Sequence, residues 1–374
     1  MTFKKIKFLI CIFNSESLRI VGINFEYNTC PVAPIDNPGS WMGEDILKSD
    51  NWLTMWSREA IAEISEANKK IRRINKSAPQ FKKHDFHIPN TELEIQLILD
   101  DLENGKGFSV LRGLSISDVG RNDIESLFWG IVNHFGTPIS QNSKGECLGH
   151  VTDLGLDAND NKVRNYQTSA EPFFHNDACD VLALMCLKPA KTGGKSRLAS
   201  IPDLFNAMFK LDESLTRELF RPYAFDRRGE PGRFDEDQKP YYLLPVFSYY
   251  AGYLSARLTP RSYIHSAQTY NDVPRMSKRM GMALDLMEEI VVRPDISFSF
   301  EMEAGDIQLV NNYCVFHSRT EYEDFKELNQ KRHLLRSWLS VPNSRILPPW
   351  FKSKWGAVAQ GKIRGGIAAS IKNT

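Results

Sequence analysis

The stretch EPFFHNDACDVLALMCLKPAKTGGKSRLAS, residues 171–200, decides how this chain is interpreted. At its centre His175 and Asp177 flank Asn176, and an apolar run follows at residues 181–187. If the motif forms a strand, side chains two residues apart share a face, so the imidazole and the carboxylate project together. Such a pair supplies two of the three ligands of a 2-His-1-carboxylate site, which binds non-heme Fe(II) and leaves positions open. The third ligand must then be a distant histidine on a neighbouring strand.

A His-x-Asp tripeptide is weak evidence alone, because such tripeptides arise by chance and a histidine near a core is usually only packed and hydrogen-bonded. A second segment, GDIQLVNNYCVFHSR at residues 305–319, supplies the missing histidine. We expect one strand from Ile307 to Phe316, with His317 at its end and far enough along the chain to return beside the first strand. The candidate catalytic and metal-ligating residues are therefore His175, Asp177 and His317.

Length and charge favour an enzyme that acts on a small molecule. The 374 residues suffice for one large domain or for a core with a substantial insertion. With 47 basic and 46 acidic residues, the chain has no electrostatic footprint for nucleic acid or for an acidic membrane. We expect neither as a partner, and a homo-oligomer stays open. The six cysteines form no CxxC pair, which predicts a reducing compartment and neither a zinc ribbon nor a disulfide framework.

The N-terminus resembles the start of a secretory signal. Basic residues at 4–7 precede an apolar run at 8–13, but the run is short and no small-residue cleavage site follows. No apolar run approaches the ~20 residues that a membrane span needs. We therefore expect a cytoplasmic protein and leave open whether residues 1–13 are a targeting signal.

Hydrophobic periodicity outlines the fold. Apolar residues at helical spacing predict helices over residues 52–73, 91–103, 121–135, 202–221 and 274–290. Alternating patterns predict strands over residues 107–113, 297–302 and 332–340, and a hairpin over residues 245–257 that turns at Ala251-Gly252. Strands on both sides of a helix-containing insert indicate a mainly β (α+β) fold, a jelly roll decorated by helices.

The strand at residues 332–340 places Arg332 and Arg336 on one face. Two arginines inside a barrel are costly unless each meets an anion. The planar fork of Arg332 suits a carboxylate. A 2-oxo acid bound to Fe(II) would leave its far carboxylate in need of such a partner. Structural ion pairs with Asp or Glu are the alternative for both arginines.

In combination and in order, these segments resemble the taurine dioxygenase-like (TauD/TfdA) family of Fe(II)/2-oxoglutarate-dependent dioxygenases. The resemblance rests on FFHND (173–177), KPAKTGGKS (188–196), GDIQLVNNYCVFHSR (305–319), RHLLR (332–336) and GFSVLRG (107–113), and it extends over about residues 90–340. It implies a double-stranded β-helix core with His175, Asp177 and His317 as iron ligands. It further implies Fe(II), 2-oxoglutarate and O2 as cofactor and co-substrates, with Arg332 on the distal carboxylate of 2-oxoglutarate.

The resemblance also suggests further site residues. Ser196 stands where the family usually has a threonine that assists this carboxylate; serine keeps the hydroxyl, but the change is a departure. Arg336 matches an arginine that meets the anionic group of the substrate in the taurine enzyme. Tyr166, Gln141 and Asn312 are substrate-contact candidates from their position near the motifs, with a structural hydrogen bond as the alternative for each.

The implied architecture is an N-terminal extension over residues 1–90 with a helix packed on the core, an oxygenase domain over 91–345 with an insert at about 202–295, and a C-terminal tail over 346–374. The implied reaction oxidises, and most simply hydroxylates, an unactivated C–H bond of a small molecule, with release of succinate and CO2. Retention of Asp177 argues against a halogenase. Desaturation, cyclisation or C–S/C–O cleavage, a zinc hydrolase with the same ligands, and a binding protein with a vestigial site remain open.

Overall fold

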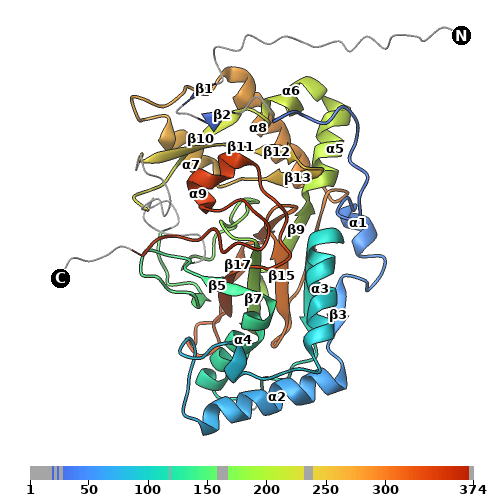
Figure 1. Cartoon of the computed structure of the whole chain (residues 1–374), viewed down its shortest axis with the longest axis vertical. Coiled ribbons are helices and arrows are strands. Elements are labelled where there is room, and N and C mark those ends of the chain that lie inside the picture. Colours follow the sequence, from blue (N-terminus) through green and yellow to red (C-terminus); the bar gives the residue numbers. More distant parts are fainter. Residues whose placement is uncertain are drawn as a thin grey trace, which may run out of the picture.

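Two sheets of unequal size form the centre of the molecule (Figure 1). The computed structural model describes residues 19–20, 23–24, 28–117, 119–157, 167–230 and 239–369. The larger sheet has the order β3-β4-β15-β7-β18-β5, with β6 paired to β18, and the smaller has the order β14-β9-β16. The strands of the larger sheet are β3 (Leu53–Met55), β4 (Phe108–Arg112), β5 (Thr137–Ile139), β6 (Gly149–Val151), β7 (Val181–Lys188), β15 (Ile307–Asn311) and β18 (His333–Ser340). Those of the smaller are β9 (Ser196–Ser200), β14 (Ser297–Phe300) and β16 (Val315–Arg319).

The larger sheet is buried on both faces. On β4, Val110 belongs to the core that lies between the two sheets, whereas its neighbour Leu111 packs under the helices. On β7, Leu182 and Ala183 divide in the same way. A strand covered on both faces needs apolar residues at every position, which explains why residues 181–187 read as a continuous apolar run.

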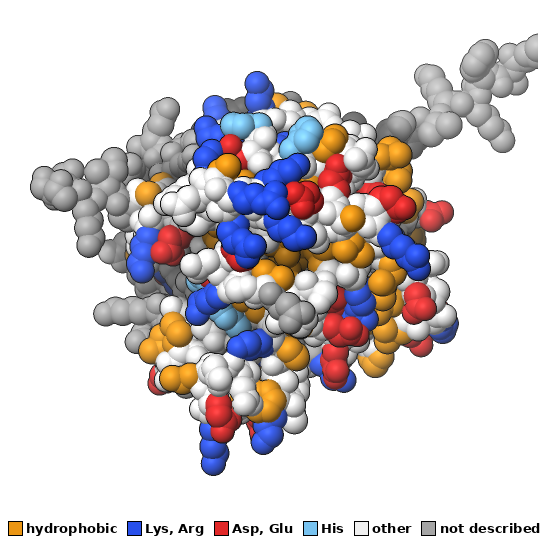
Figure 2. Space-filling model, turned by 90° about the horizontal axis from the view of Figure 1, so that it is seen from below, with side chains coloured by type: hydrophobic (Ala, Val, Ile, Leu, Met, Phe, Trp, Pro, Cys, Tyr) orange, Lys and Arg blue, Asp and Glu red, His pale blue; other side chains and the backbone are white. Residues whose placement is uncertain are grey.

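Three helices cover the outer face of the larger sheet: α2 (Arg58–Arg73), α3 (Glu92–Asn104) and α4 (Arg121–Phe135). The helix predicted from residue 52 begins later, because residues 53–55 form the edge strand β3. Ser57 caps α2 by accepting a hydrogen bond from the Ala60 N–H at 3.0 Å. Seen from the α2 end, the surface mixes lysine and arginine side chains with acidic and hydrophobic ones (Figure 2).

The predicted insert lies between β9 and β14. Its elements are α5 (Ile201–Leu211), α6 (Glu213–Glu218), β10 (Pro222–Asp226), β11 (Tyr241–Pro245), β12 (Phe247–Tyr250), β13 (Tyr253–Ala256), α7 (Arg261–Ala267) and α8 (Lys278–Val291). The single helix predicted over 202–221 is broken at Asp212, whose backbone is extended and whose carboxylate caps α6. The hairpin of β12 and β13 turns at Ala251-Gly252, as predicted.

The prediction of one strand from Ile307 to Phe316 is wrong. Strand β15 ends at Asn311, and a turn separates it from β16, which starts at Val315. The Asn311 side chain stabilises the turn by accepting a hydrogen bond from the Tyr313 N–H at 3.0 Å, a common use of asparagine. His317 therefore lies in the middle of β16, which pairs with β9, rather than at the end of a strand.

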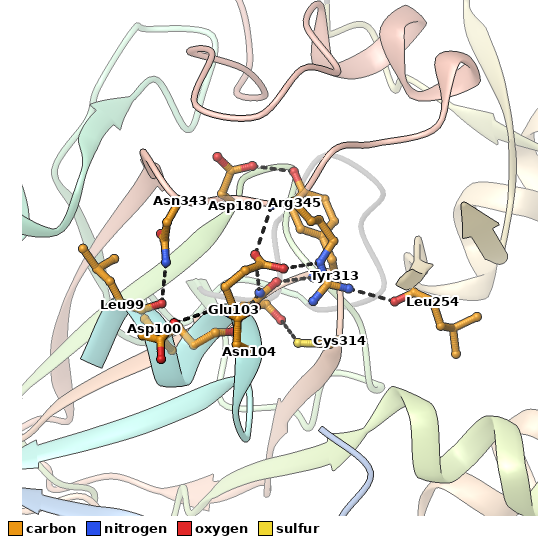
Figure 3. A network of polar contacts seen from close by, with 12 residues as sticks. Leu99, Asp100, Glu103, Asn104, Asp180, Leu254, Tyr313, Cys314, Asn343 and Arg345 are labelled. Atoms are coloured by element: carbon orange, nitrogen blue, oxygen red, sulfur yellow. Dashed lines mark hydrogen bonds and ion pairs between the residues drawn. The ribbon is translucent and has the colours of Figure 1, made fainter. Parts of the chain in front are cut away.

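The segment predicted as a C-terminal tail packs into the protein. It contains η4 (Pro349–Phe351) and α9 (Lys352–Trp355), and Trp350 and Trp355 are buried. Arg364 is fully buried and pairs with Asp180. Asp180 and Tyr313 lie close to a second buried ion pair, that of Glu103 and Arg345 (Figure 3).

The remaining elements are short: β1 (Arg19–Ile20), β2 (Ile23–Asn24), α1 (Gly43–Ile46), η2 (Lys83–Asp85), β8 (Thr192–Gly193) and β17 (Tyr322–Glu323). Within the described residues, none of the helices has the length and apolar character of a membrane span. Residues 1–13, the possible targeting signal, lie outside the described part of the chain.

Candidate active site

The His-x-Asp motif lies just before β7 and is held against β16 by an isolated bridge rather than by a regular strand. The His175 N–H donates to the His317 carbonyl at 3.0 Å, and the His317 N–H donates back to the His175 carbonyl at 3.0 Å. This reciprocal pair of backbone bonds places the two histidines directly opposite each other. The distant third residue thus returns beside the motif.

Asn176, between the two ligand candidates, has its side chain hydrogen-bonded to backbone groups of other segments. Asn176 is buried, and its side-chain amide donates to the carbonyls of Ala256 and Asn312, both at 2.8 Å. Its side-chain oxygen accepts from the Leu258 N–H at 2.9 Å, and Arg257 donates to its main-chain oxygen at 2.6 Å. The insert therefore holds the motif from one side, which periodicity in the sequence does not reveal.

His175, Asp177 and His317 converge. One ligand atom from each lies within 4.8 Å of the others, and His317 Nε2 is 3.9 Å from Asp177 Oδ2. The two imidazole ring centres are 4.5 Å apart. Two imidazoles bound at right angles to one metal ion, with metal–nitrogen distances of about 2.1 Å, would have ring centres roughly 4.5 Å apart. The donor set and its spacing fit Fe(II).

Both imidazoles are held in the neutral form that a metal requires. His175 Nδ1 contacts the Phe173 carbonyl at 2.8 Å, so in the neutral ring Nδ1 carries the hydrogen and Nε2 offers its lone pair. Burial lowers the pKa of His175. Burial and the neighbouring His175 lower the pKa of His317 to about 3. His317 Nδ1 is buried and finds no hydrogen-bond partner in the described part of the chain.

Asp177 is oriented by two residues far away in the sequence. The indole N–H of Trp338 donates to Asp177 Oδ2 at 2.9 Å, and Asn312 Oδ1 accepts from the Asp177 main-chain N–H at 2.9 Å. Burial alone would raise the pKa of Asp177, but His317, Arg336 and the Trp338 hydrogen bond lower it overall. The carboxylate therefore stays charged.

Trp338 was not among the predicted site residues. The alternation of β18 nevertheless placed it on the same face as Arg332 and Arg336, which was the available signal. Asn312 is buried, and its amide contacts Asp177 and the Cys179 thiol. This is the structural role that the sequence left open for it.

Arg332 has no carboxylate partner for its guanidinium in the described residues. It is 7% exposed, its Nη2 donates weakly to the Gly194 carbonyl at 3.5 Å, and its Nη1 is buried without a partner. Asp324 accepts from the main-chain N–H of Arg332. Burial lowers the pKa of Arg332. A buried, orphaned guanidinium nitrogen is the feature that an incoming carboxylate would satisfy.

The Ser196 hydroxyl points away from Arg332 in its bonding: it donates to Gln308 Oε1 on β15 of the larger sheet. Gln141 is 3% exposed and binds Arg336 twice, accepting from its Nε at 2.5 Å and donating to its carbonyl at 3.0 Å. The Arg336 guanidinium lies 5.4 Å from the Trp338 ring centre. Gln141 thus positions Arg336. Tyr166 lies outside the described residues.

Comparison with known proteins decides the family. The model of the taurine catabolism dioxygenase TauD, TfdA family matches residues 73–338. The chain belongs to this family. Its members are Fe(II)- and 2-oxoglutarate-dependent dioxygenases, and the protein is such an enzyme, with Fe(II), 2-oxoglutarate and O2 as cofactor and co-substrates.

Two curated relatives cover most of the chain. FR-33289 synthase of Streptomyces rubellomurinus is 29% identical over 337 residues, which are 88% of this chain and 97% of that protein. The taurine hydroxylase-like protein SAT17 of Stachybotrys chartarum is 24% identical over 307 residues, 79% of this chain and 77% of that protein.

Solved structures of TauD-like fold confirm the architecture. Asparagine oxygenase in complex with Fe(II), 3-hydroxyasparagine and succinate has a TM-score of 0.59 at 16% identity, over 78% of this chain and 94% of that one. The non-heme iron oxygenase OrfP in complex with Fe, succinate and (3S)-hydroxy-L-Arg has a TM-score of 0.57 at 14% identity, over 77% and 94%. The double-stranded β-helix core that the sequence predicted for this chain is confirmed.

Proposed function

We propose that His175, Asp177 and His317 hold the Fe(II) of this dioxygenase. The observation that supports this most strongly is their convergence within 4.8 Å, with both imidazoles neutral and the carboxylate charged. When bound, Fe(II) together with 2-oxoglutarate and O2 supplies the oxidation of a C–H bond, with release of succinate and CO2. Trp338 and Asn312 fix the orientation of Asp177, and the Phe173 carbonyl fixes the tautomer of His175.

Arg332 binds the distal carboxylate of 2-oxoglutarate in this proposal. Its unpartnered Nη1 and its lack of an acidic partner in the described residues support the role. A bidentate guanidinium–carboxylate pair would repay the desolvation of a buried arginine. Ser196 is a lesser candidate for the same carboxylate, because its hydroxyl already donates to Gln308.

The substrate is a small molecule with an anionic group, which Arg336 contacts, and the reaction is hydroxylation. Arg336 supports this because it lies close enough to Asp177 to lower the pKa of that carboxyl, and Gln141 holds its Nε. The relatives point the same way: the compared structures contain hydroxyasparagine and hydroxyarginine. Desaturation, cyclisation and C–S/C–O cleavage are further outcomes of the same chemistry. The substrate contacts of Tyr166, Gln141 and Asn312, a cytoplasmic location and a homo-oligomeric state also stay predictions.

The test is succinate formation. Purified protein with Fe(II), 2-oxoglutarate and O2 should release succinate and CO2, slowly without substrate and faster with an oxidisable one. His317→Ala, with an unchanged melting temperature, should release none. Turnover that persists without O2 would point instead to a hydrolase with the same ligands, and succinate release by His317→Ala would overturn the ligand assignment.

A further inference from the structure

Two buried arginines share one aromatic ring beside the proposed co-substrate site. The guanidinium carbons of Arg319 and Arg332 lie 4.7 and 5.1 Å from the centre of the Tyr322 ring. All three residues are at most 8% exposed. At these distances each cation is attracted by the ring, and the attraction is strongest where water is excluded.

Neither guanidinium forms an ion pair with a carboxylate in the described part of the chain. Arg319 donates to the main-chain carbonyls of Thr168, Ser169 and Thr320 at 2.5, 2.8 and 3.2 Å. The Arg332 side chain has its long contact with the Gly194 carbonyl and a second contact with the hydroxyl of Tyr322. Burial and the charge of Arg332 lower the pKa of Arg319 to about 10, so the two cations repel each other. Two buried positive charges whose hydrogen-bond acceptors are neutral carbonyls and a neutral hydroxyl create a positive potential that attracts an anion.

The position of the ring is fixed by a tight ribbon. Tyr322 starts β17 and pairs with Gly193 of β8, and the Gly194 N–H donates to the Glu321 carbonyl at 3.1 Å. Gly193 has φ +73°, and a Cβ there would lie 2.2 Å from the Glu321 carbonyl oxygen. A Cβ at Gly194 would lie 3.0 Å from Arg332 Nε. The Gly193-Gly194 turn therefore allows the ribbon to lie directly against Arg332.

We propose that Tyr322 is a positioning residue for the co-substrate: its ring holds the Arg332 guanidinium in the orientation that leaves Nη1 available, and Arg319 adds positive charge for the same anion. The inference rests on the proposed role of Arg332 and extends it to two residues that the sequence motifs did not single out. The competing explanation is that Tyr322 only fills space in the core. That explanation predicts a loss of stability without a selective effect on dicarboxylates.

The experiment compares two 2-oxo acids on two variants. Affinities of 2-oxoglutarate and of 2-oxobutyrate, which lacks the distal carboxylate, are measured by calorimetry on the anaerobic Fe(II)-loaded protein. Tyr322→Leu should weaken 2-oxoglutarate about tenfold and leave 2-oxobutyrate and Fe(II) affinity unchanged. Tyr322→Phe keeps the ring and should stay within about threefold of the wild type.

Each other outcome is decisive. Equal weakening of both 2-oxo acids by Tyr322→Leu, or no weakening of either, would overturn the positioning role. An equal loss in Tyr322→Phe and Tyr322→Leu would assign the effect to the hydroxyl and overturn the role of the ring. Arg332→Ala serves as the reference: if it leaves the 2-oxoglutarate affinity unchanged, the proposed function of Arg332 fails. If Arg332→Ala weakens binding and Tyr322→Leu does not, only the present inference fails.

Discussion

Asp177 and Asp180 are three residues apart, and Asp180 is buried while Asp177 is partly buried, yet the larger difference lies in their partners. The carboxylate of Asp180 accepts from the Tyr313 hydroxyl and Arg364 Nε, both at 2.6 Å, and from the Val341 N–H and the Ser340 hydroxyl at 3.0 and 3.2 Å. Asp177 receives one side-chain hydrogen bond, from Trp338, and faces His317.

The difference separates a structural carboxylate from the proposed metal ligand. A buried carboxylate with four donors, one of them the Arg364 guanidinium, has its hydrogen bonds and its charge satisfied and does not need a metal ion. Asp177 keeps its charge but lacks such a shell in the described residues, and its neighbours are two neutral imidazoles. Burial and charge alone therefore do not distinguish the proposed metal ligand from a structural carboxylate. What distinguishes it is that few hydrogen-bond donors satisfy it and other possible ligands lie beside it.

The buried arginines repeat this contrast. Arg345 Nε pairs with Glu103 at 2.6 Å, and its Nη1 donates to the Leu254 carbonyl (Figure 3). Arg332 has an unpartnered Nη1 and no acidic partner for its guanidinium in the described residues. An ion pair with Asp or Glu was the alternative interpretation for Arg332. In the structure it is Arg345, not Arg332, that forms such a pair, with Glu103.

The largest effect should come from exchanging the two aspartates for alanine in separate variants. Asp177→Ala should lower turnover at least about 10³-fold, because a metal ligand is lost, with little change in melting temperature. Asp180→Ala should lower the free energy of unfolding by about 3–5 kcal/mol, because Arg364 is left buried and unpaired. Thermal unfolding and succinate release are measured on both. An Asp180→Ala variant with wild-type stability would contradict the structural role assigned to Asp180.

Next in size is the pair of arginines. Arg332→Ala should raise the Michaelis constant for 2-oxoglutarate about 100-fold, because a charge-assisted bidentate contact is worth a few kcal/mol. Arg345→Ala should instead destabilise the fold, since Glu103 loses its partner, and should leave that constant unchanged. Steady-state kinetics and thermal unfolding separate the two. An unmoved constant in Arg332→Ala would refute the co-substrate assignment.

A smaller effect is expected at Trp338. Trp338→Phe keeps the aromatic packing but removes the hydrogen bond to Asp177, and should weaken Fe(II) binding about tenfold. Fe(II) affinity is measured anaerobically, and the melting temperature is the control. An Fe(II) affinity equal to that of the wild type would mean that the Trp338 hydrogen bond does not contribute to metal binding by Asp177.

The last prediction concerns pH, and its effect is small within any one pH unit. The pKa of His317 in the folded protein, about 3, lies below its ordinary value near 6.5, so below pH 6.5 the unfolded chain binds a proton that the folded one does not. Metal-free protein should lose up to about 1 kcal/mol of stability per pH unit from this group between pH 6.5 and 4. His317→Gln should show a shallower decline in thermal unfolding over that window. An identical decline would show that His317 titrates normally.

The sequence predicted the ligand set because its determinants are local. Spacing in the His-x-Asp motif and the apolar run ahead of His317 are properties of short segments. The alternation over residues 332–340 likewise predicted that Arg332 and Arg336 share one face. The turn after Asn311 was missed because its flanking residues are apolar on both sides and mask the break.

What the sequence did not reveal depends on contacts between distant segments. The Asp180–Arg364 pair joins residues 184 apart, and nothing near Arg364 marks it as part of the core. The Trp338–Asp177 bond and the approach of Tyr322 to Arg332 are likewise set by how strands meet. Local patterns thus predicted the proposed ligands, while the residues that orient them required the structure.

The central claim is that the open shell of Asp177, with the two histidines, binds Fe(II) in reach of a co-substrate held by Arg332. The most direct measurement is an anaerobic titration of Fe(II) and 2-oxoglutarate into the purified protein, followed by its visible absorption. We predict the weak charge-transfer band of the chelate in the wild type and in Asp180→Asn, and its loss in Asp177→Ala. Iron binding without the band in the wild type, or a band that survives in Asp177→Ala, would contradict the account.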